Sequence, residues 1–188
     1  MRPDGRSGAP STIDTNASDP LEELDSDLLD FAEWYQNNLG ALVWFAMLLG
    51  ARRHEALDLT HDALVAAYPH WATIARPRAY VRASITRAYR HRRNIADKEF
   101  PVDQVPDHVA RPDNALDDIE FDDQQQRVLN MIRQLPWRQR QIMAWTLDGY
   151  APGEIAKMLG LRGGTVRVNL LKARNALKNL LVEGGPHA

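Results

Sequence analysis

The chain has 188 residues, and its 23 lysines and arginines against 25 aspartates and glutamates give a formal net charge of −2. It contains no cysteine, which excludes disulfides, thiolate metal sites and cysteine nucleophiles. The longest apolar stretch, residues 39–50, is shorter than the ~20 residues that cross a bilayer and lies too far from the N-terminus for a signal peptide. A cytoplasmic protein is therefore the simplest expectation.

The small net charge hides four blocks of opposite sign. Residues 1–30 carry eight acids and two arginines, a balance of −6, and residues 76–93 carry seven arginines and no acid. Residues 103–123 carry eight acids and one arginine, a balance of −7, and residues 157–178 carry six basic residues and no acid. The two basic blocks indicate contacts with polyanions. The acidic blocks can shield them, act as tethers or keep the chain in solution.

Helical periodicity runs through most of the chain, without a strand pattern of useful length or an internal repeat. Residues 1–25, rich in Gly, Pro, Ser and Asp, are predicted to be a disordered N-terminal extension. Residues 26–98 read as a first helical domain, and residues 99–118, with three prolines, as an acidic flexible linker. A second helical domain follows over residues 119–183, and residues 184–188 form a tail. We therefore predict an all-α protein of two small helical domains.

The second domain shows its helix boundaries most clearly. Residues 121–135 are amphipathic and predict a helix that Pro136 ends. The same proline can begin the next helix, which Gly149 ends. Residues 151–160 predict a short helix closed by a glycine turn, and a final basic helix begins near Gly164. A short helix, a glycine turn and a second helix are typical of a helix-turn-helix.

The outer face of the final helix combines basic, polar and apolar side chains. It is predicted to carry Thr165, Arg167, Val168, Asn169, Leu171, Lys172 and Arg174. A helix of this kind fits the major groove, where lysine and arginine reach guanine edges or phosphates, asparagine reads adenine, and valine or leucine touches a thymine methyl group. From spacing alone, the alternative is the solvated basic face of an ordinary helical hairpin.

An ordered set of motifs runs through the second domain. In chain order they are Leu135-Pro136, Arg140, Gly149, Glu154-Ile155-Ala156, Leu159-Gly160, Gly164-Thr165-Val166-Arg167 and Ala173-Arg174. Each motif alone is weakly specific, but the ordered set resembles region 4 of the sigma-70 family of bacterial transcription initiation factors. The most similar group is the small extracytoplasmic-function (ECF) sigma factors.

The first domain extends this resemblance. Asp58-Leu59-Thr60-His61-Asp62, then Tyr68 and Trp71, and then the arginine block of residues 76–93 follow the order of region 2 in ECF sigma factors. The resemblance covers residues 28–98 and 119–182. It implies a region 2 helical bundle and a region 4 helix-turn-helix domain.

An acidic stripe precedes the arginine block. On a helix, Glu55, Asp58 and Asp62 share one face, which suits a basic partner. The resemblance implies that Glu55, Asp58, His61 and Asp62 contact the clamp helices of the β′ subunit of core RNA polymerase. The alternative is a solvated helix face. The histidines lack the spacing of a zinc site, so we expect neither a metal nor another cofactor.

The arginine block can follow the phosphates of a DNA strand while neighbouring aromatic rings stack on its bases. The resemblance implies that the loop before this block captures a flipped base of the −10 promoter element. The candidate −10 contacts are Trp71, Thr73, Ile74, Ala75, Arg76, Arg78, Tyr80, Arg82, Arg87, Tyr89 and Arg90. For Trp71, a place in the core is the favoured alternative.

The resemblance assigns the −35 element to the final helix. The candidate contacts are Arg162, Thr165, Arg167, Val168, Asn169, Leu171, Lys172 and Arg174.

Several residues depart from the family pattern: Thr86, Arg90, Ala151, Gly163-Gly164 and Val168-Asn169. Ala151 replaces a helix-capping serine, a loss of ~1 kcal/mol. Because base-reading positions are among the changes, the promoter sequence is not predicted.

The leading hypothesis is a sigma factor, which is not an enzyme. Its expected partners are core RNA polymerase, through the β′ clamp helices and the β subunit, promoter DNA and an anti-sigma factor, without membrane insertion. A sigma mimic that sequesters an anti-sigma factor is one alternative, although it should have lost both basic blocks. An ordinary helix-turn-helix regulator is another, but it leaves the arginine block without a role. A nucleic-acid enzyme would need a catalytic constellation, and none is apparent.

Overall fold

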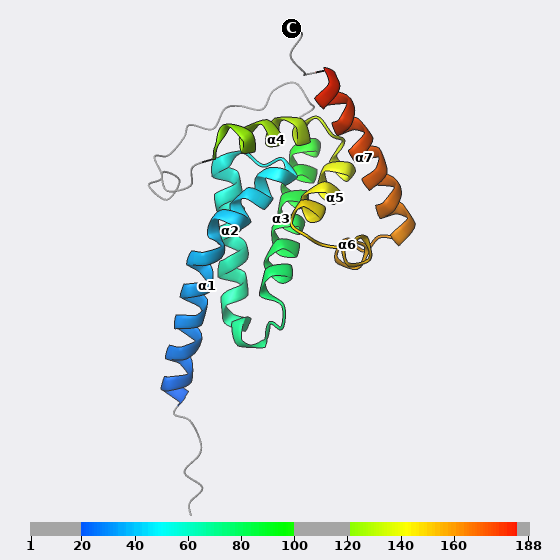
Figure 1. Cartoon of the computed structure of the whole chain (residues 1–188). Coiled ribbons are helices and arrows are strands. Elements are labelled where there is room, and N and C mark those ends of the chain that lie inside the picture. The colour runs from blue at the N-terminus through cyan, green and yellow to red at the C-terminus, as the bar shows by residue number, and fades with distance from the viewer. Residues whose placement is uncertain (1–19, 100–120, 184–188) are drawn as a thin grey trace, which may run out of the picture.

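The computed structural model describes residues 20–99 and 121–183 (Figure 1). Its elements, in chain order, are α1 (Pro20–Leu49), α2 (Arg53–Ala67), the 3-10 helix η1 (Tyr68–Thr73), α3 (Pro77–Glu99), α4 (Asp123–Arg133), α5 (Trp137–Leu147), α6 (Pro152–Leu159) and α7 (Gly163–Glu183).

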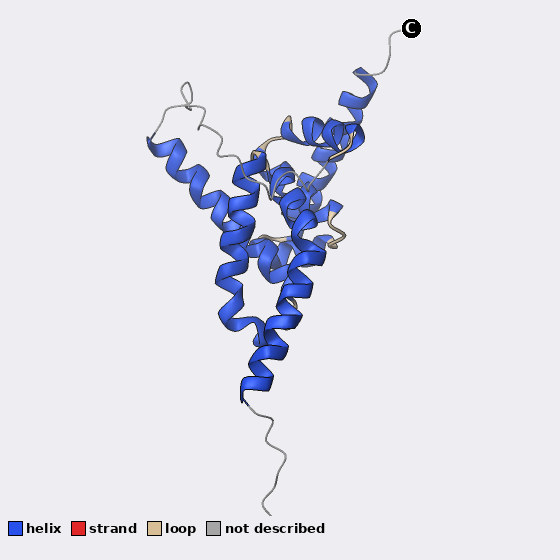
Figure 2. Ribbon diagram, turned by 90° about the vertical axis from the view of Figure 1, so that its left-hand side faces the viewer, coloured by secondary structure: helices blue, strands red, loops and turns tan. Residues whose placement is uncertain are grey.

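 Figure 2 shows only helices and loops in these two ranges, and the predicted all-α class is confirmed. In the part of the chain that the structure describes, no helix is long and apolar enough to span a membrane.

The helix boundaries differ from the predicted domain boundaries at two places. Helix α1 begins at Pro20, so it includes the last residues of the segment for which disorder was predicted. Helix α3 ends at Glu99, the first residue of the predicted linker. Residues 100–118 of that linker and the tail of residues 184–188 lie outside the described residues.

Helices α1, α2 and α3 form the first domain, and η1 reverses the chain between α2 and α3 (Figure 1). Its core consists of apolar side chains that recur at helical spacing, including Leu42, Val43, Leu57, Leu64, Val81 and Ile85, all at most 2% exposed. Burial of each such side chain stabilises the fold by about 1.5–3 kcal/mol. The long apolar stretch of residues 39–50 is therefore the core half of α1.

Helices α4 to α7 form the second domain, and its breaks fall where the sequence predicts them. Pro136 precedes α5, Gly149 (φ +93°) follows it, and Gly160 (φ +63°) ends α6, whose bounds are Pro152–Leu159. Glycine adopts these left-handed conformations without steric cost. Ala151 offers no capping side chain, but its N–H donates to Glu154 Oε2 over 3.1 Å, so half of a capping box remains.

The two domains share one continuous core. Three aromatic pairs join them: Phe45 and Trp145, with centroids 5.3 Å apart, Trp44 and Phe121 at 5.3 Å, and Tyr89 and Trp137 at 5.6 Å. Trp145 is completely buried. The predicted helical domains are therefore present, but they pack directly against each other in this structure.

The side chain of Arg140 of α5 packs tightly at this junction, against the end of α4 and against Gly50. Its Nη2 donates to the carbonyl oxygens of Arg133 (2.7 Å) and Leu135 (3.0 Å), which satisfies acceptors at the end of α4. Its guanidinium also passes against Gly50, where a Cβ atom would overlap Arg140 Nη1 and stand 3.0 Å from Tyr89 Oη. Gly50 also has φ +114°, a conformation that other residues rarely adopt.

Replacing Gly50 with alanine should therefore lower the free energy of unfolding by about 1–3 kcal/mol, through backbone strain and displacement of Arg140. Urea denaturation measures this change. Gly40→Ala is the matched control, because Gly40 lies within α1 and a Cβ there meets no atom within 4 Å. The control should gain up to ~1 kcal/mol. Equal stability of the Gly50 variant and the unchanged protein would contradict the close fit.

Candidate nucleic-acid interface

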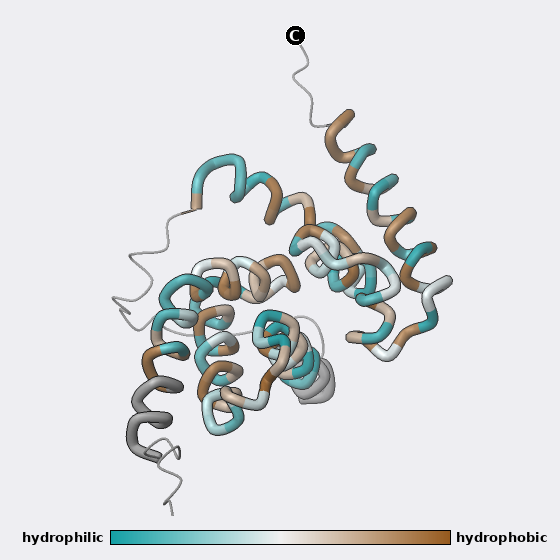
Figure 3. The backbone as a smooth tube through the Cα atoms, turned by 60° about the horizontal axis from the view of Figure 1, so that its bottom comes forward, coloured by the Kyte–Doolittle hydropathy of each residue, from teal (hydrophilic) through white to brown (hydrophobic). Residues whose placement is uncertain are grey.

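Helix α7 lies along the edge of the second domain (Figure 1). One of its faces is buried and the opposite face is exposed. Val166, Leu170 and Ala173 pack into the core. In Figure 3 hydrophobic and hydrophilic segments alternate along α7, as an amphipathic helix requires. The predicted −35 contacts that are exposed are Arg162, Thr165, Arg167, Val168, Leu171, Lys172 and Arg174.

The open face of α7 is basic and carries apolar side chains among its charges. Val168 is 52% exposed and Leu171 is 61% exposed. None of the basic side chains of α7 forms an ion pair within the described ranges. Asn169 differs from the prediction, since it is half-buried and its Nδ2 donates to Thr165 O (2.8 Å). This bond uses one of the two Nδ2 hydrogens, so the second N–H and Oδ1 remain for other contacts.

The four residues predicted to bind polymerase lie along α2: Glu55, Asp58, His61 and Asp62. Asp58 and Asp62 are exposed, and Asp62 forms an ion pair with Arg92 of α3 (2.8 Å). His61 Nε2 is hydrogen-bonded to Tyr35 Oη (2.9 Å), and the two rings are stacked. Among the described residues, Asp58 alone of the four has no bonded partner. It is the acid most available to another protein.

Other features of α2 complete this surface. Glu55 is half-buried, and its Oε2 accepts from Arg52 N (3.3 Å) at the start of the helix. Val65 is 72% exposed and lies one turn beyond Asp62. No group of three metal-ligating side chains occurs in the two described ranges. The α2 surface therefore combines acidic and apolar side chains without the ligand set of a metal site.

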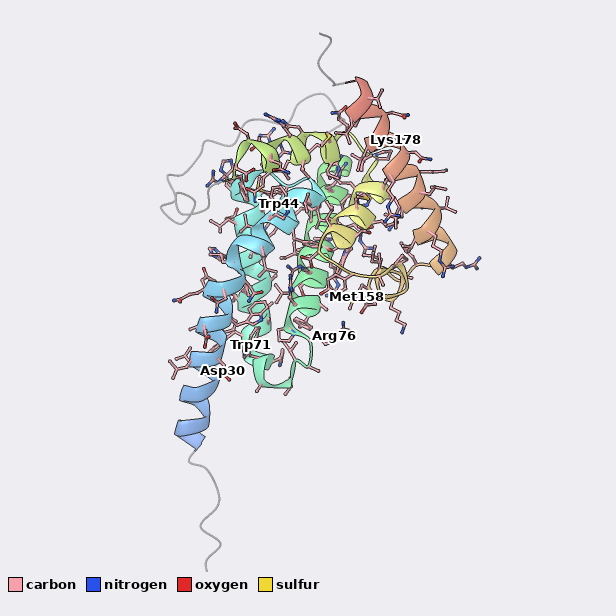
Figure 4. The ribbon with its side chains drawn as sticks, in the orientation of Figure 1. Asp30, Trp44, Trp71, Arg76, Met158 and Lys178 are labelled. Carbon is pink, nitrogen blue, oxygen red and sulfur yellow. The ribbon has the colours of Figure 1, made fainter. Side chains whose placement is uncertain are left out.

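The predicted −10 contacts divide into exposed and buried residues. Thr73, Ala75, Arg76, Arg78, Tyr80, Arg87 and Arg90 are exposed, whereas Trp71 and Ile74 are half-buried. Figure 4 shows Trp71 near the chain reversal at η1. Its ring packs edge-to-face on Phe31 and Trp34, with centroids 4.8 and 4.9 Å away. Trp71 thus packs against the core, in the direction of the favoured alternative, but it remains half-buried.

Two predicted DNA contacts are buried in this structure. Tyr89 is 4% exposed and packs against Trp137 of α5, and burial raises the pKa of its hydroxyl. Arg82 is fully buried between the domains. Both side chains are buried, so the interpretation of both as surface contacts does not hold for this arrangement. Helical spacing placed them correctly on α3 but could not show that the second domain covers that face.

Arg82 forms a two-pronged ion pair with Asp148, which follows α5. Arg82 Nη2 donates to Asp148 Oδ1 over 2.7 Å, and Nε lies 2.5 Å from Oδ2. The guanidinium also stands over the Phe45 ring, 5.6 Å from its centroid. Burial lowers the pKa of Arg82 and raises the pKa of Asp148, while the attraction between them opposes both shifts. Burial removes the hydration of both charged groups, and the attraction between them offsets part of that cost.

Two further arginines face the second domain at the start of α3. Arg76 Nη2 donates to Glu154 Oε1 of α6 (3.2 Å), and Arg78 Nη2 lies 3.8 Å from Asp148 Oδ1. A cleft of about 470 Å³ runs between these groups, with Trp34 and Tyr150 also in its lining. Figure 4 shows Arg76 at this junction. Glu154 was recognised only as part of a motif and Asp148 not at all, and no arginine partner was predicted for either, although they are the only acids between residues 136 and 182.

The comparisons with known proteins agree with this architecture. Residues 125–177 match the family model for sigma-70, region 4. The fold is similar to the sigma factor RpoE, solved in complex with the anti-sigma factor NepR from Bartonella quintana, with TM-score 0.61 and 21% identity over 84% of this chain and 99% of that chain. It is also similar to CnrH, solved with the cytosolic domain of CnrY, with TM-score 0.59 and 19% identity over 88% and 96% of the two chains. Comparison with curated proteins found no match.

The region 4 match runs from α4 to α7 and contains the whole helix-turn-helix. The structural likeness extends over both domains and, at these identities, shows a shared fold. The resemblance seen in the ordered motifs of the second domain is confirmed by this match. Residues 125–177 therefore resemble region 4 of the sigma-70 family, and the described chain has a two-domain helical fold similar to that of the sigma factors RpoE and CnrH.

Proposed function

We propose that the protein is an ECF-type sigma factor that binds core RNA polymerase and directs it to a class of promoters. Region 2 recognises and melts the −10 element, and region 4 reads the −35 element. The observation that carries this proposal is the open basic face of α7, which follows α6 in a helix-turn-helix within the matched region 4. Such a helix enters the major groove with its first turns against the base edges. Polymerase performs the chemistry, so the proposal requires no catalytic residue.

Region 4 offers charges for phosphates and side chains for bases. Arg167, Lys172 and Arg174 can neutralise phosphates or reach guanines, since no carboxylate among the described residues pairs with them. Val168 and Leu171 present apolar surface that fits thymine methyl groups. This combination supports sequence-dependent binding of duplex DNA more than a merely solvated helix.

Region 2 offers separate surfaces for polymerase and for DNA. The α2 surface, with Asp58 and Val65 exposed, suits basic and apolar groups of the β′ clamp helices. On α3, Tyr80, Arg87 and Arg90 are exposed and combine an aromatic ring with cations, as binding of single-stranded DNA requires. Arg76 and Arg78 can join them when the second domain moves away.

The alternatives explain less of the molecule. A sigma mimic has no need of the basic face that α7 retains, and an ordinary helix-turn-helix regulator has no need of a region 2 domain. The related RpoE and CnrH chains were solved with the anti-sigma factor NepR and with CnrY. An anti-sigma factor is therefore the regulatory partner that we propose for this chain.

Lys172→Ala should weaken binding to duplexes that the protein and core polymerase select from a random pool. We expect a loss of about 1–3 kcal/mol, or roughly 5- to 150-fold in affinity, with a salt dependence lower by about one counterion. Fluorescence anisotropy at several salt concentrations measures both quantities. Lys178→Ala is the control, since it removes the same charge from the exposed, more C-terminal part of α7. Equal losses in the two variants would show a general charge effect instead of groove contact.

Asp58→Lys should weaken binding to purified core RNA polymerase at least about tenfold, because it places a cation opposite a basic partner surface. Titration of the protein onto immobilised core polymerase measures the dissociation constant. Glu33→Lys, at an exposed position of α1, makes the same change in charge and should bind like the unchanged protein. Failure of the unchanged protein to bind core polymerase would overturn the proposed function, and normal binding of Asp58→Lys would overturn the placement of the contact on α2.

A further inference from the structure

A second cavity, of about 590 Å³, lies where the end of α1 and the start of α2 meet α4 and α5. In Figure 1, α4 lies across the end of α1 at this place. The cavity has the volume of a small-molecule site, ~300–1,000 Å³. Among the described residues, the charged side chains that line it are all arginines: Arg52, Arg53, Arg133 and Arg140. None of them is a predicted contact with DNA or polymerase, so the proposed function leaves this cavity without a role.

Two of these arginines have no carboxylate partner among the described residues. Neither Arg133 nor Arg140 forms an ion pair there. Arg140 Nη2 donates to the carbonyl oxygen of Arg133 (2.7 Å), and within the same ranges Arg140 Nε is buried without a hydrogen-bond partner. Burial lowers the pKa of Arg140, and the nearby charges of Arg93 and Arg133 lower it further, although Tyr89 opposes the shift. A cation that has lost hydration near like charges is stabilised by an anion.

The other lining residues add an aromatic wall and room for a ligand. Phe121 lines the cavity and packs on Trp44, with centroids 5.3 Å apart, while the Arg53 guanidinium stands 5.7 Å from the Phe121 centroid. Arginine binds phosphate oxygens through two parallel N–H bonds, and several guanidinium groups suit an anion with several charges. A lone carboxylate would neutralise only one of the four arginines. The lining therefore favours a chain of phosphates over a simple carboxylic acid.

We propose that this cavity binds a small molecule with a chain of two or three phosphates, held by Arg52, Arg53, Arg133 and Arg140. The phosphate chain supplies the negative charge that Arg133 and Arg140 lack in the described chain. Its source is either a nucleotide, whose base meets the ring of Phe121, or a free inorganic polyphosphate. The site goes beyond the proposed function, because its ligand is neither DNA nor polymerase.

Isothermal titration calorimetry of the full chain with inorganic tripolyphosphate, at physiological salt, tests the site. We expect saturable binding of one tripolyphosphate per chain. GTP is titrated in parallel to identify the source of the phosphates: tighter binding of GTP indicates a nucleotide, and equal or weaker binding indicates the phosphate chain alone. The absence of saturable binding for both probes would overturn the proposal. No polymerase or promoter is present, so the result does not depend on the proposed function.

Arg52→Gln with Arg133→Gln should weaken tripolyphosphate binding at least about tenfold, because two charge-assisted contacts are lost. Arg127→Gln with Lys178→Gln is the matched control, since it removes the same charge from exposed positions of α4 and α7 outside the cavity. The control should bind within about twofold of the unchanged protein, because salt screens distant charges. Equal weakening in both variants would show general attraction to a basic surface and would overturn the site.

Two further measurements keep the test decisive. If circular dichroism shows that the double variant does not fold, Arg52→Gln alone replaces it, since Arg52 is exposed, with an expected loss of about threefold and Arg127→Gln as its control. The chain's own acids are the rival occupant, because Asp117, Asp118 and Glu120 directly precede Phe121 in the sequence. If tripolyphosphate binds only after these three are changed to Asn, Asn and Gln, the chain fills its own cavity and the proposal is overturned.

Discussion

The ion pair between Arg82 and Asp148 fixes how the two domains meet. Arg82 comes from the middle of the arginine block and is fully buried, while Asp148 follows α5 just before the helix-turn-helix. A buried guanidinium requires a carboxylate because burial removes its hydration. Once this pair forms, the start of α3 lies against the loop before α6, and Arg76 meets Glu154. The position of the α3 arginines relative to the helix-turn-helix therefore follows from this one contact.

The apolar contacts around the pair explain why a charged junction is stable. Phe45 lies under the guanidinium and packs on Trp145, which also meets Tyr150. Aromatic rings bury large areas and tolerate a cation above their faces. A buried ion pair contributes little net stability, but loss of either partner leaves an uncompensated buried charge. The aromatic rings thus supply the attraction, and the charges select which surfaces meet.

The features that depend on local sequence could be predicted. Pro136, Gly149 and Gly160 mark helix ends through their own backbone preferences, and the apolar spacing of α7 identifies its buried face. A core place was favoured for Trp71, and its half-buried ring packs against the core. The ordered motifs of region 4 add a family resemblance that the match to residues 125–177 confirms.

The features that depend on contacts between distant segments could not be predicted. Arg82 and Tyr89 share a helix with exposed arginines, and periodicity alone does not reveal that α5 and its following loop cover their side of α3. Asp148 is one of only two acids between residues 136 and 182, which is the signal that the sequence offers, but a partner cannot be chosen from charge alone. Sequence patterns therefore indicate which surfaces exist, while the structure shows which of them are occupied by the chain itself.

Run-off transcription with purified core RNA polymerase, with and without this protein, tests the central claim most directly. The template is a fragmented genomic library from the organism that encodes the chain. A sigma factor should yield discrete transcripts that appear only when the protein is present and that share sequence motifs upstream of their starts. If the protein neither binds core polymerase nor produces any such transcript, its assignment as a sigma factor is contradicted.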